Sequence, residues 1–407
     1  KQQLCYDNLT RVCYSKQPFK ETTLHTVLSV FGTRPEAIKM APLIRILKET
    51  TGIRTLTAVT AQHREMLDQV LALFEIRPEY DLDLMSPRQT LTEITCRALA
   101  GLEQVLVRVK PDLVLVHGDT TTTFAAALSS FYHNVTVGHV EAGLRTFNKQ
   151  SPFPEELNRR LTGSLADLHF APTVRARENL LREGIPANTI FVTGNTVIDS
   201  LQTTVRPDFT FPEPLLNRID FSRPVLLAEV HRRESWGEPL EAICRAFRRL
   251  VDDLQLPLIF PVHRNPVVRE TVERLLGNHD RIHLLEPLDT ASFHNLMQRC
   301  RLVLTDSGGI QEEAPSLGRP VLVLRDITER PEAVEAGTVK VVGTAEEAVY
   351  SAARRLLENP AAYDAMARAI NPYGDGRAAR RIREALLYHF GLRPDRPADF
   401  SPGSSRD

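Results

Sequence analysis

Short apolar runs alternate with amphipathic segments along most of the chain. From residue 25 the sequence HTVLSVFGTRPEAIKMAPLIRILKE predicts a strand, a glycine turn and a helix whose apolar side carries Ile38, Leu43, Ile46 and Leu47. Further strand and helix pairs follow, and their strands are apolar throughout instead of alternating between polar and apolar residues. Strands of this kind are typical of a parallel sheet that helices cover on both faces. The pattern therefore predicts an α/β fold.

The alternation is interrupted once and then resumes. The segment from Asn195 to Arg223 is rich in proline and polar residues, which indicates a crossing between two domains. We therefore predict two Rossmann-like domains that face one another across a cleft. The predicted parts are an extension outside the fold (1–23), a first domain (24–194), a second domain (195–375), a helix that returns to the first domain (376–392) and a disordered tail (393–407).

One stretch of the second predicted domain, residues 302–331, has the pattern of a ligand-binding turn. Its sequence LVLTDSGGIQEEAPSLG reads as a buried strand, a turn with Gly308 and Gly309, and a helix. The first N–H groups of a helix have no partner inside it, and glycines let a ligand approach the backbone, so the turn suits an anion. The alternative is that the glycines only permit a tight turn. Glu312 and Glu313 suit hydroxyl groups, such as those of a ribose, better than phosphate.

Composition and charge exclude several classes of partner. The 407 residues are 42% apolar and 25% charged, with a formal net charge of −1, which gives no reason to expect a nucleic acid or an anionic membrane as a partner. No apolar run approaches the roughly 18–20 residues of a membrane helix. No secretory signal pattern is present, so we expect a cytoplasmic protein. The five cysteines are scattered and the histidines form no metal-binding motif, so we expect no disulfide, metal or other cofactor.

Three carboxylates stand where strands of the first domain end. They are Asp119 in HGDTTT, Glu141 in HVEAGLRT and Glu155 in SPFPEELNRR. The carboxyl ends of parallel strands meet at one crevice, so these residues can face the same substrate. In a partly desolvated cleft, neighbouring carboxylates have different pKa values, so that one can act as an acid and another as a base. The alternatives are that Asp119 only caps the helix that begins at Thr120, and that Glu155 is only a favourable charge in the first turn of a helix.

Cations gather at strand ends of both domains. His231 and His263 each follow a strand of the second domain, and with Arg330 they form a positive rim around the glycine turn that fits a diphosphate. Arg34 and Lys39 bracket the first glycine turn of the chain and suggest another anion site. The alternative for each is an ordinary exposed charge. Neither domain carries GxGxxG or a Walker motif, which argues against a dehydrogenase and a P-loop phosphotransferase. A sugar nucleotide would fit a cleft with the carboxylates of the first domain on one side and the positive rim of the second domain on the other.

A series of motifs, in order and at natural spacing, resembles the non-hydrolysing UDP-N-acetylglucosamine 2-epimerases of bacteria. They include FGTRPEAIKMAPLI, HGDTTTTFAAAL, HVEAGLRT, SPFPEELNRRLTG, HRRESWGEPL, TDSGGIQEEAPSLG and NPYGDGRA, and the resemblance covers residues 26–390. It implies a glycosyltransferase-B-type fold, a homodimer, and reversible interconversion of UDP-N-acetylglucosamine and UDP-N-acetylmannosamine without a cofactor. It also implies that UDP is eliminated to leave 2-acetamidoglucal, and is added back after protonation on the other face.

The resemblance further implies roles for individual residues. The implied catalytic set is Asp119, Glu141, Glu155 and His231. The implied substrate-binding set, with Phe293 against uracil and Glu313 at the ribose, is Arg34, Lys39, Arg159, Phe293, Ser307, Gly308, Gly309, Glu313 and Arg330. Some members of the family bind a second UDP-N-acetylglucosamine as an activator, and the corresponding residues here are Gln62, Arg88, Arg232 and His263.

Two positions depart from the family pattern. Glu65 stands where activator-dependent members tend to have Gln, so strict dependence on an activator is open. Glu229 precedes His231 where the family usually shows Val-Thr and a small or apolar residue, and an inward carboxylate there would disturb diphosphate binding. Three other functions stay open at this point: a hydrolysing epimerase that releases UDP and N-acetylmannosamine, a UDP-sugar sensor without turnover, and a glycosyltransferase of the same fold.

Overall fold

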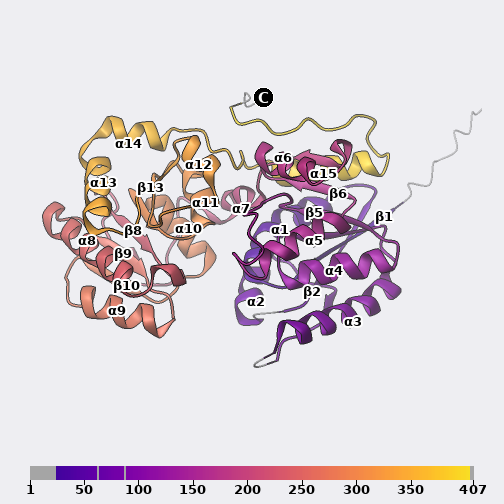
Figure 1. Cartoon of the computed structure of the whole chain (residues 1–407), viewed down its shortest axis with the longest axis horizontal. Coiled ribbons are helices and arrows are strands. Elements are labelled where there is room, and N and C mark those ends of the chain that lie inside the picture. The colour runs from indigo at the N-terminus through magenta and orange to yellow at the C-terminus, as the bar shows by residue number, and fades with distance from the viewer. Residues whose placement is uncertain (1–23, 62–63, 87–88, 404–407) are drawn as a thin grey trace, which may run out of the picture.

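The computed structural model describes residues 24–61, 64–86 and 89–403, which form two α/β lobes (Figure 1). Each lobe is built on one sheet, and the strand pairings of both sheets are parallel. This confirms the fold class predicted from apolar strands that lack a polar and apolar alternation. The predicted extension, residues 1–23, lies outside the described residues.

The first sheet has the strand order β3-β2-β1-β4-β5-β6-β7. Its strands are β1 (His25–Phe31), β2 (Ile53–Val59), β3 (Tyr80–Asp81), β4 (Leu113–His117), β5 (Thr136–Val140), β6 (Leu168–Ala171) and β7 (Ile190–Val192). The helices of this lobe are α1 (Arg34–Lys48), α2 (Arg64–Leu73), α3 (Leu91–Val109), α4 (Thr121–Tyr132), α5 (Glu155–Leu165), α6 (Val174–Arg182) and the short η1 (Ala187–Thr189). The strand order reverses direction between β1 and β4, the place where open α/β sheets bind ligands.

The second sheet has the order β10-β9-β8-β11-β12-β13. Its strands are β8 (Leu226–Glu229), β9 (Leu258–Pro261), β10 (Ile282–Leu285), β11 (Leu302–Thr305), β12 (Val321–Val323) and β13 (Val339–Val341). Its helices are α8 (Glu238–Leu254), α9 (Pro266–Leu276), α10 (Thr290–Arg299), α11 (Ile310–Ser316), α12 (Pro331–Glu335), α13 (Glu346–Glu358), α14 (Pro360–Ala367), η2 (Leu216–Arg218) and η3 (Arg233–Ser235). The direction reverses between β8 and β11, which places the predicted glycine turn at the switch point.

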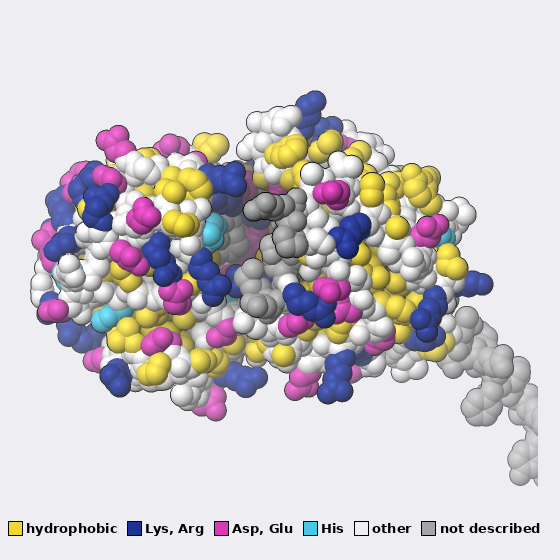
Figure 2. All heavy atoms as spheres, turned by 90° about the horizontal axis from the view of Figure 1, so that it is seen from below, with side chains coloured by type: hydrophobic (Ala, Val, Ile, Leu, Met, Phe, Trp, Pro, Cys, Tyr) yellow, Lys and Arg dark blue, Asp and Glu magenta, His cyan; other side chains and the backbone are white. Residues whose placement is uncertain are grey.

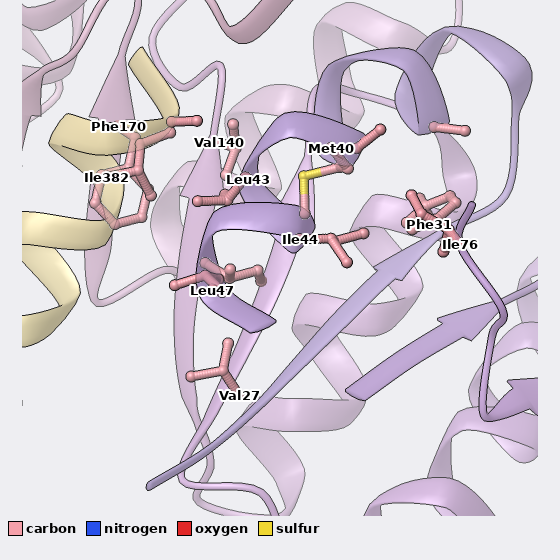
Figure 3. Packing of buried hydrophobic residues seen from close by; sticks show 14 of the residues in the cluster. Val27, Phe31, Met40, Leu43, Ile44, Leu47, Ile76, Val140, Phe170 and Ile382 are labelled. Atoms are coloured by element: carbon pink, nitrogen blue, oxygen red, sulfur yellow. The ribbon is translucent and has the colours of Figure 1, made fainter. Parts of the chain in front are cut away.

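Helix α1 shows how the sequence pattern positions the site. The Glu36 carboxylate accepts hydrogen bonds from the main-chain N–H groups of Gly32 at 3.0 Å and Thr33 at 2.7 Å, which satisfies donors at the start of the helix. The apolar face of the helix packs into the core of the first lobe (Figure 3), through Met40, Leu43, Ile44 and Leu47. With that face buried and the start fixed, Arg34 and Lys39 lie at the carboxyl edge of the sheet.

Two helices connect the lobes. Helix α7 (Thr196–Thr204) packs against α1 of the first lobe and against α10 and α11 of the second. Helix α15 (Ala378–His389) packs against α1 and α7 and places Ile382 in the core of the first lobe (Figure 3). The chain therefore passes to the second lobe at α7 and lies on the first lobe again at α15. None of the described helices has both the length and the apolar character needed to cross a membrane.

The C-terminal segment differs from the expectation of a disordered tail. It runs along the first lobe (Figure 1), where the N–H of Phe400 donates to the carbonyl of Val192 at 2.7 Å. The guanidinium of Arg396 donates to the carbonyl of Asn188 at 2.7 Å and lies 4.0 Å from the ring centroid of Phe191, and Phe400 is buried. The prediction of disorder is therefore wrong for residues 393–403, because the segment covers the open edge of β7. Residues 404–407 lie outside the described residues.

Candidate active site

The candidate site lies between the lobes, at the carboxyl edges of both sheets. Figure 2 shows the surface hollowed between the two lobes. A cavity of about 260 Å³, here called the first-lobe cavity, adjoins one of about 440 Å³, the second-lobe cavity. Both cavities are lined by Pro35, Lys39 and Arg330. They therefore meet at a lysine of α1 and an arginine of the loop before α12.

Glu141 lines the first-lobe cavity and is held between Lys39 and His117. The Nζ atom of Lys39 donates to its two carboxylate oxygens at 2.8 and 2.6 Å, and Nε2 of His117 lies 2.8 Å from Oε2. Burial alone would raise the pKa of Glu141, but Lys39 and His117 outweigh it and hold the pKa well below its usual range. Burial lowers the pKa of Lys39, and the attraction of Glu141 more than offsets that effect. Both groups therefore stay charged near neutral pH.

The backbone of Glu141 is unusual. Its φ is 63°, in the left-handed region that residues with a Cβ rarely adopt. Such conformations cost about 1–3 kcal/mol and gather at functional sites, where the surrounding structure enforces them. The contact between Glu141 and His117 was not predicted from the sequence. His117 could have been considered because it is the last residue of β4, at the same edge of the sheet.

Asp119 lines the same cavity and pairs with an arginine. The Nη2 atom of Arg159 donates to Oδ2 of Asp119 at 2.5 Å. The residue that caps α4 is Thr120, whose hydroxyl accepts a hydrogen bond from the N–H of Thr123 at 3.1 Å. The alternative of Asp119 as a helix cap is therefore wrong. Its carboxylate lies in the cavity with 29% of the side chain exposed.

Glu155 does not line the first-lobe cavity. It is the first residue of α5, which places it in the first turn, and its buried Oε2 atom has no hydrogen-bond partner in the described part of the chain. The neighbouring Glu156 is fully buried instead, and accepts hydrogen bonds from the N–H groups of Thr146 at 3.0 Å and Phe147 at 3.1 Å. The structure thus brings Asp119 and Glu141 together at the cavity and leaves Glu155 at the start of a helix.

A chain of buried polar groups joins the two lobes at the site. The Nδ2 atom of Asn195 donates to Oε2 of Glu312 at 2.6 Å and to Oε1 of Glu141 at 3.4 Å. Glu312 also forms an ion pair with Arg330. Burial raises the pKa of Glu312, although Arg330 and Lys39 oppose it. From the sequence, Glu312 was interpreted only as an acceptor for ligand hydroxyl groups. Its contacts with Asn195 and Arg330 could not be predicted, because they depend on how the two lobes meet.

On the second lobe, the imidazole of His231 lies in the cavity beside a carboxylate. Its Nδ1 atom lies 2.6 Å from Oε1 of Glu229, whose other oxygen accepts a hydrogen bond from the hydroxyl of Thr305 at 3.0 Å. Glu229 therefore does line the cavity, as a partner of His231. Burial lowers the pKa of His231, but Glu229 and Asp306 outweigh it, so the pKa is raised. This favours the imidazolium form.

Asp306 fixes the loop that carries His231. It is fully buried, and its carboxylate accepts hydrogen bonds from the N–H of His231 at 3.1 Å, the N–H of Arg232 at 2.9 Å and the hydroxyl of Ser235 at 2.9 Å. Ligand atoms of Glu229, His231 and Asp306 lie within 4.8 Å of one another, a spacing that metal ligands also show. Because these donors already engage Asp306, we interpret the group as a hydrogen-bonded anchor of the loop.

Most of the other predicted substrate residues line the second-lobe cavity. These are Arg34, Lys39, Phe293, Ser307, Gly309, Glu313 and Arg330. The Glu313 carboxylate lies 3.4 Å from Nε2 of His294. Burial would raise the pKa of Glu313, but His294 outweighs it and the pKa is lowered. Glu313 is therefore an anionic acceptor inside the cavity.

The two glycines of the turn are not required by the packing of the protein itself. A Cβ added at Gly308 would lie 3.5 Å from the nearest atom, a guanidinium nitrogen of Arg232. A Cβ added at Gly309 would meet only a carboxylate oxygen of Glu313, also at 3.5 Å. By contrast, a Cβ at Gly32 would lie 2.1 Å from the hydroxyl of Thr60. Gly309 lines the second-lobe cavity, whereas a Cβ at Gly308 would face the side chains of Arg232, Arg330 and Glu329.

The structure describes two of the four predicted activator residues, Arg232 and His263. Arg232 forms an ion pair with Glu329 at 3.2 Å and does not line either cavity. The ring of His263 stacks on that of His231 with centroids 5.6 Å apart, in the second-lobe cavity itself. The other two predicted activator residues lie outside the described residues: Gln62 and Arg88.

The two lobes, each built on a parallel sheet, meet at the carboxyl edges of those sheets. They define a two-domain protein with a glycosyltransferase-B-like fold. The chain belongs to the UDP-N-acetylglucosamine 2-epimerase family, whose profile matches residues 45–387. It is 57% identical over 376 residues to the UDP-N-acetylglucosamine 2-epimerase of Bacillus subtilis, a match that covers 92% of this chain and 98% of that protein. The enzyme of Escherichia coli K12 is 54% identical over 368 residues, which is 88% and 98% of the two chains.

Solved structures show the same fold. A Staphylococcus aureus MnaA structure with UDP superposes with a TM-score of 0.86 at 50% identity, covering 93% of this chain and 100% of that one. The UDP-N-acetylglucosamine 2-epimerase of Neisseria meningitidis, bound to UDP-N-acetylglucosamine, superposes with a TM-score of 0.82 at 50% identity, covering 89% and 99%. The family suggested by the sequence motifs is thereby confirmed.

Proposed function

We propose that this protein interconverts UDP-N-acetylglucosamine and UDP-N-acetylmannosamine by reversible elimination and re-addition of UDP, and that it is an isomerase that needs no cofactor. The observation that carries the proposal is the meeting of two unlike walls at Lys39 and Arg330. Asp119 and Glu141 lie on the first-lobe side, and the UDP-binding candidates lie on the second-lobe side. Relatives with the same fold bind UDP and UDP-N-acetylglucosamine.

The second lobe would bind the nucleotide. The diphosphate would lie against Ser307, Gly308 and Gly309, with Arg330 and the imidazolium of His231 supplying positive charge. Gly309 supports this placement, because it lines the cavity and the packing of the described residues would tolerate a side chain there. Glu313 would accept hydrogen bonds from the ribose hydroxyls, since its lowered pKa keeps it ionised.

Phe293 and Arg34 complete the proposed nucleotide site. Phe293 lies in α10 and lines the second-lobe cavity, where its ring offers a face on which uracil can stack. Arg34 reaches the same cavity from the start of α1. A nucleotide bound there would touch both lobes, and its diphosphate would point toward Lys39 and Arg330, where the two cavities join.

The first lobe would carry out the proton chemistry. A carboxylate removes the proton from C2 of the sugar while the bond between C1 and the diphosphate oxygen breaks, so that the electron pair of the C–H bond forms a C1–C2 double bond and UDP leaves as an anion. Returning a proton to the other face of C2 and re-adding UDP at C1 gives the epimer. Asp119 and Glu141, held by Arg159 and Lys39, are the carboxylates that line the cavity.

The leaving group is the reason for the cationic wall. Negative charge grows on the diphosphate as the C1–O bond breaks, and preorganised cations stabilise such charge more strongly in a cleft than in water. Arg330 is held by its ion pair with Glu312, and His231 is held by Glu229 and the Asp306 anchor. Neither group has to be moved into place when UDP departs.

Proton NMR of the reacting sugars tests the proposal. Starting from either UDP-sugar, the same equilibrium mixture of the two should form, with UDP in an amount no larger than the enzyme. Stoichiometric release of UDP with free N-acetylmannosamine would show a hydrolysing epimerase and contradict reversible re-addition. Binding of both sugars without conversion would instead show a sensor.

A further inference from the structure

A large cavity lies apart from the candidate active site. Its volume is about 830 Å³, and it shares no lining residue with the first-lobe or second-lobe cavity. It opens between the connector that follows α7 and the strands and helices of the second lobe. Its charged lining residues are all arginines: Arg206, Arg223, Arg299, Arg301 and Arg319. We refer to it as the arginine cavity.

Neutral groups hold the arginines from the second lobe. The Nη2 atom of Arg299 donates to the carbonyl of Phe209 at 2.7 Å, and its guanidinium lies 4.8 Å from the ring centroid of Phe211. The guanidinium of Arg301 lies 3.3 Å from the ring centroid of Tyr363. Carbonyls and aromatic faces orient a guanidinium while leaving its charge in place. These side chains are therefore preorganised and still cationic.

Within the described part of the chain, no carboxylate forms an ion pair with any of the five arginines. The Nε atom of Arg319 is buried and has no hydrogen-bond partner among the residues that the structure describes. Asp220 lies near Arg223, but it does not line the cavity, and its Oδ1 accepts hydrogen bonds from the N–H and hydroxyl of Ser222 at 3.0 and 2.6 Å. Like charges around a concave surface repel one another and concentrate a positive potential, which an anion would relieve.

We propose that the arginine cavity binds a small anion that carries two or more phosphate groups. Guanidinium forks match phosphate oxygens, and five of them exceed what one monoanion can engage. The concave shape and the volume suit a small molecule, since ligand sites commonly span about 300–1,000 Å³. The lining also includes Phe221, Pro207 and Pro224, which offer an apolar wall to an organic portion of the ligand.

The position of the cavity gives the bound anion a structural effect. Arg206 and Arg223 belong to the connector between the lobes, whereas Arg299, Arg301 and Arg319 belong to the strands and helices of the second lobe or to its turns. An anion bound by both groups would tie the connector to the second lobe. Since α7, which precedes the connector, also packs on α1, we expect the anion to stabilise the folded protein by mass action.

Isothermal titration calorimetry with inorganic tripolyphosphate tests the site on the full chain. The wild type and the variant Arg330→Gln, which weakens the nucleotide site, should both bind tripolyphosphate. Adding Arg206→Gln and Arg319→Gln to the Arg330→Gln variant should weaken binding at least tenfold, and the double variant Arg206→Gln/Arg319→Gln without Arg330→Gln should keep its epimerase activity. Arg249→Gln, which removes an exposed arginine paired with Glu347 elsewhere on the lobe, should bind like the wild type.

Two further readouts keep the test decisive. The exposed single variant Arg206→Gln should fold normally and lose affinity by about threefold, so a folding defect of the double variant does not hide the effect. Tripolyphosphate should raise the melting temperature of Arg330→Gln but not of the triple variant Arg206→Gln/Arg319→Gln/Arg330→Gln. No binding by the wild type, or binding lost in Arg330→Gln and kept in the double variant, would overturn the proposal.

Discussion

The Oε1 atom of Glu229 lies 2.6 Å from Nδ1 of His231, so a carboxylate supports the histidine at the edge of the second-lobe cavity. The carboxylate departs from the family pattern, and its position answers the question raised by the sequence. It does not stand free in the second-lobe cavity, because one oxygen faces the imidazole and the other accepts a hydrogen bond from Thr305. Its negative charge is thus matched by the imidazolium that it favours.

The pH dependence of the reaction should report this pair. Burial and the neighbouring Arg232 lower the pKa of His231. Glu229 and Asp306 raise it by more, so the net pKa is raised. The ring of His263 stacks on that of His231. Because the folded pKa is raised, the imidazolium and the stability it contributes are present at low pH and are lost as pH rises through the folded pKa. Glu229→Gln should therefore shift the basic limb of the kcat/KM profile to lower pH. An unshifted basic limb would show that the pair does not control His231.

The second prediction concerns Glu141. Changing Glu141→Gln keeps the shape but removes the charge that Lys39 and His117 hold, so kcat should fall by about 100-fold or more, while UDP affinity changes little. Glu347→Gln, which alters an exposed glutamate paired with Arg249 on the second lobe, is the matched control and should keep full activity. Steady-state kinetics and UDP titration measure the two effects. Full activity of the Glu141 variant would rule out its role in proton transfer.

The third prediction separates ligand binding from folding at the glycine turn. Gly309→Ala adds a methyl group at a residue that lines the second-lobe cavity and leaves 3.5 Å to the nearest atom, so the melting temperature should stay within about 2 °C of the wild type. The same methyl group would occupy the space of the diphosphate, and UDP affinity should fall about tenfold, or about 1.4 kcal/mol. Unchanged UDP affinity in a normally folded variant would place the diphosphate elsewhere.

The fourth prediction concerns Glu313. Glu313→Ala removes the proposed acceptor for the ribose hydroxyls and leaves the first-lobe carboxylates intact. UDP affinity should fall by about 1.5–3 kcal/mol, the worth of a hydrogen bond to a charged group, whereas the rate of proton exchange at saturating substrate should fall much less. Calorimetry with UDP and exchange kinetics provide the two values. Normal UDP affinity in this variant would show that the ribose lies against other residues.

The fifth prediction tests the C-terminal segment. Phe400→Ala deletes a buried ring that the segment places against the first lobe, so the free energy of unfolding should fall by about 3 kcal/mol. Asp395→Ala, a change in the same segment at an exposed residue, is the control and should have little effect. Denaturant titration measures both. Equal stability of the two variants would mean that the segment does not pack as described.

The sequence located the parts of the site that depend on single strands. Asp119, Glu141 and His231 each follow an apolar strand closely and could be read directly, because the carboxyl ends of parallel strands meet at one crevice. The link from Asn195 to Glu312 could not be read, since it requires both lobes and a crossing helix to be in place. Glu155 was expected beside the other carboxylates, but it does not line the first-lobe cavity and is the first residue of α5.

The C-terminal segment shows a different reason for an error. Its many prolines and charged residues are typical of disorder, and composition alone weighs them heavily. What orders the segment is one phenylalanine, one arginine on an aromatic ring and the open hydrogen-bonding edge of β7. An unpaired strand edge is visible only once the order of the strands is known.

The most direct test of the account follows the hydrogen at C2 of the sugar. The enzyme is incubated with UDP-N-acetylglucosamine in deuterium oxide, and proton NMR records both UDP-sugars as they approach equilibrium. We predict that one deuterium enters each sugar at C2 and at no other carbon, because solvent exchanges with the carboxylates that remove and return that proton. Epimerisation with the original hydrogen retained at C2 would contradict proton removal by these carboxylates and with it the proposed mechanism.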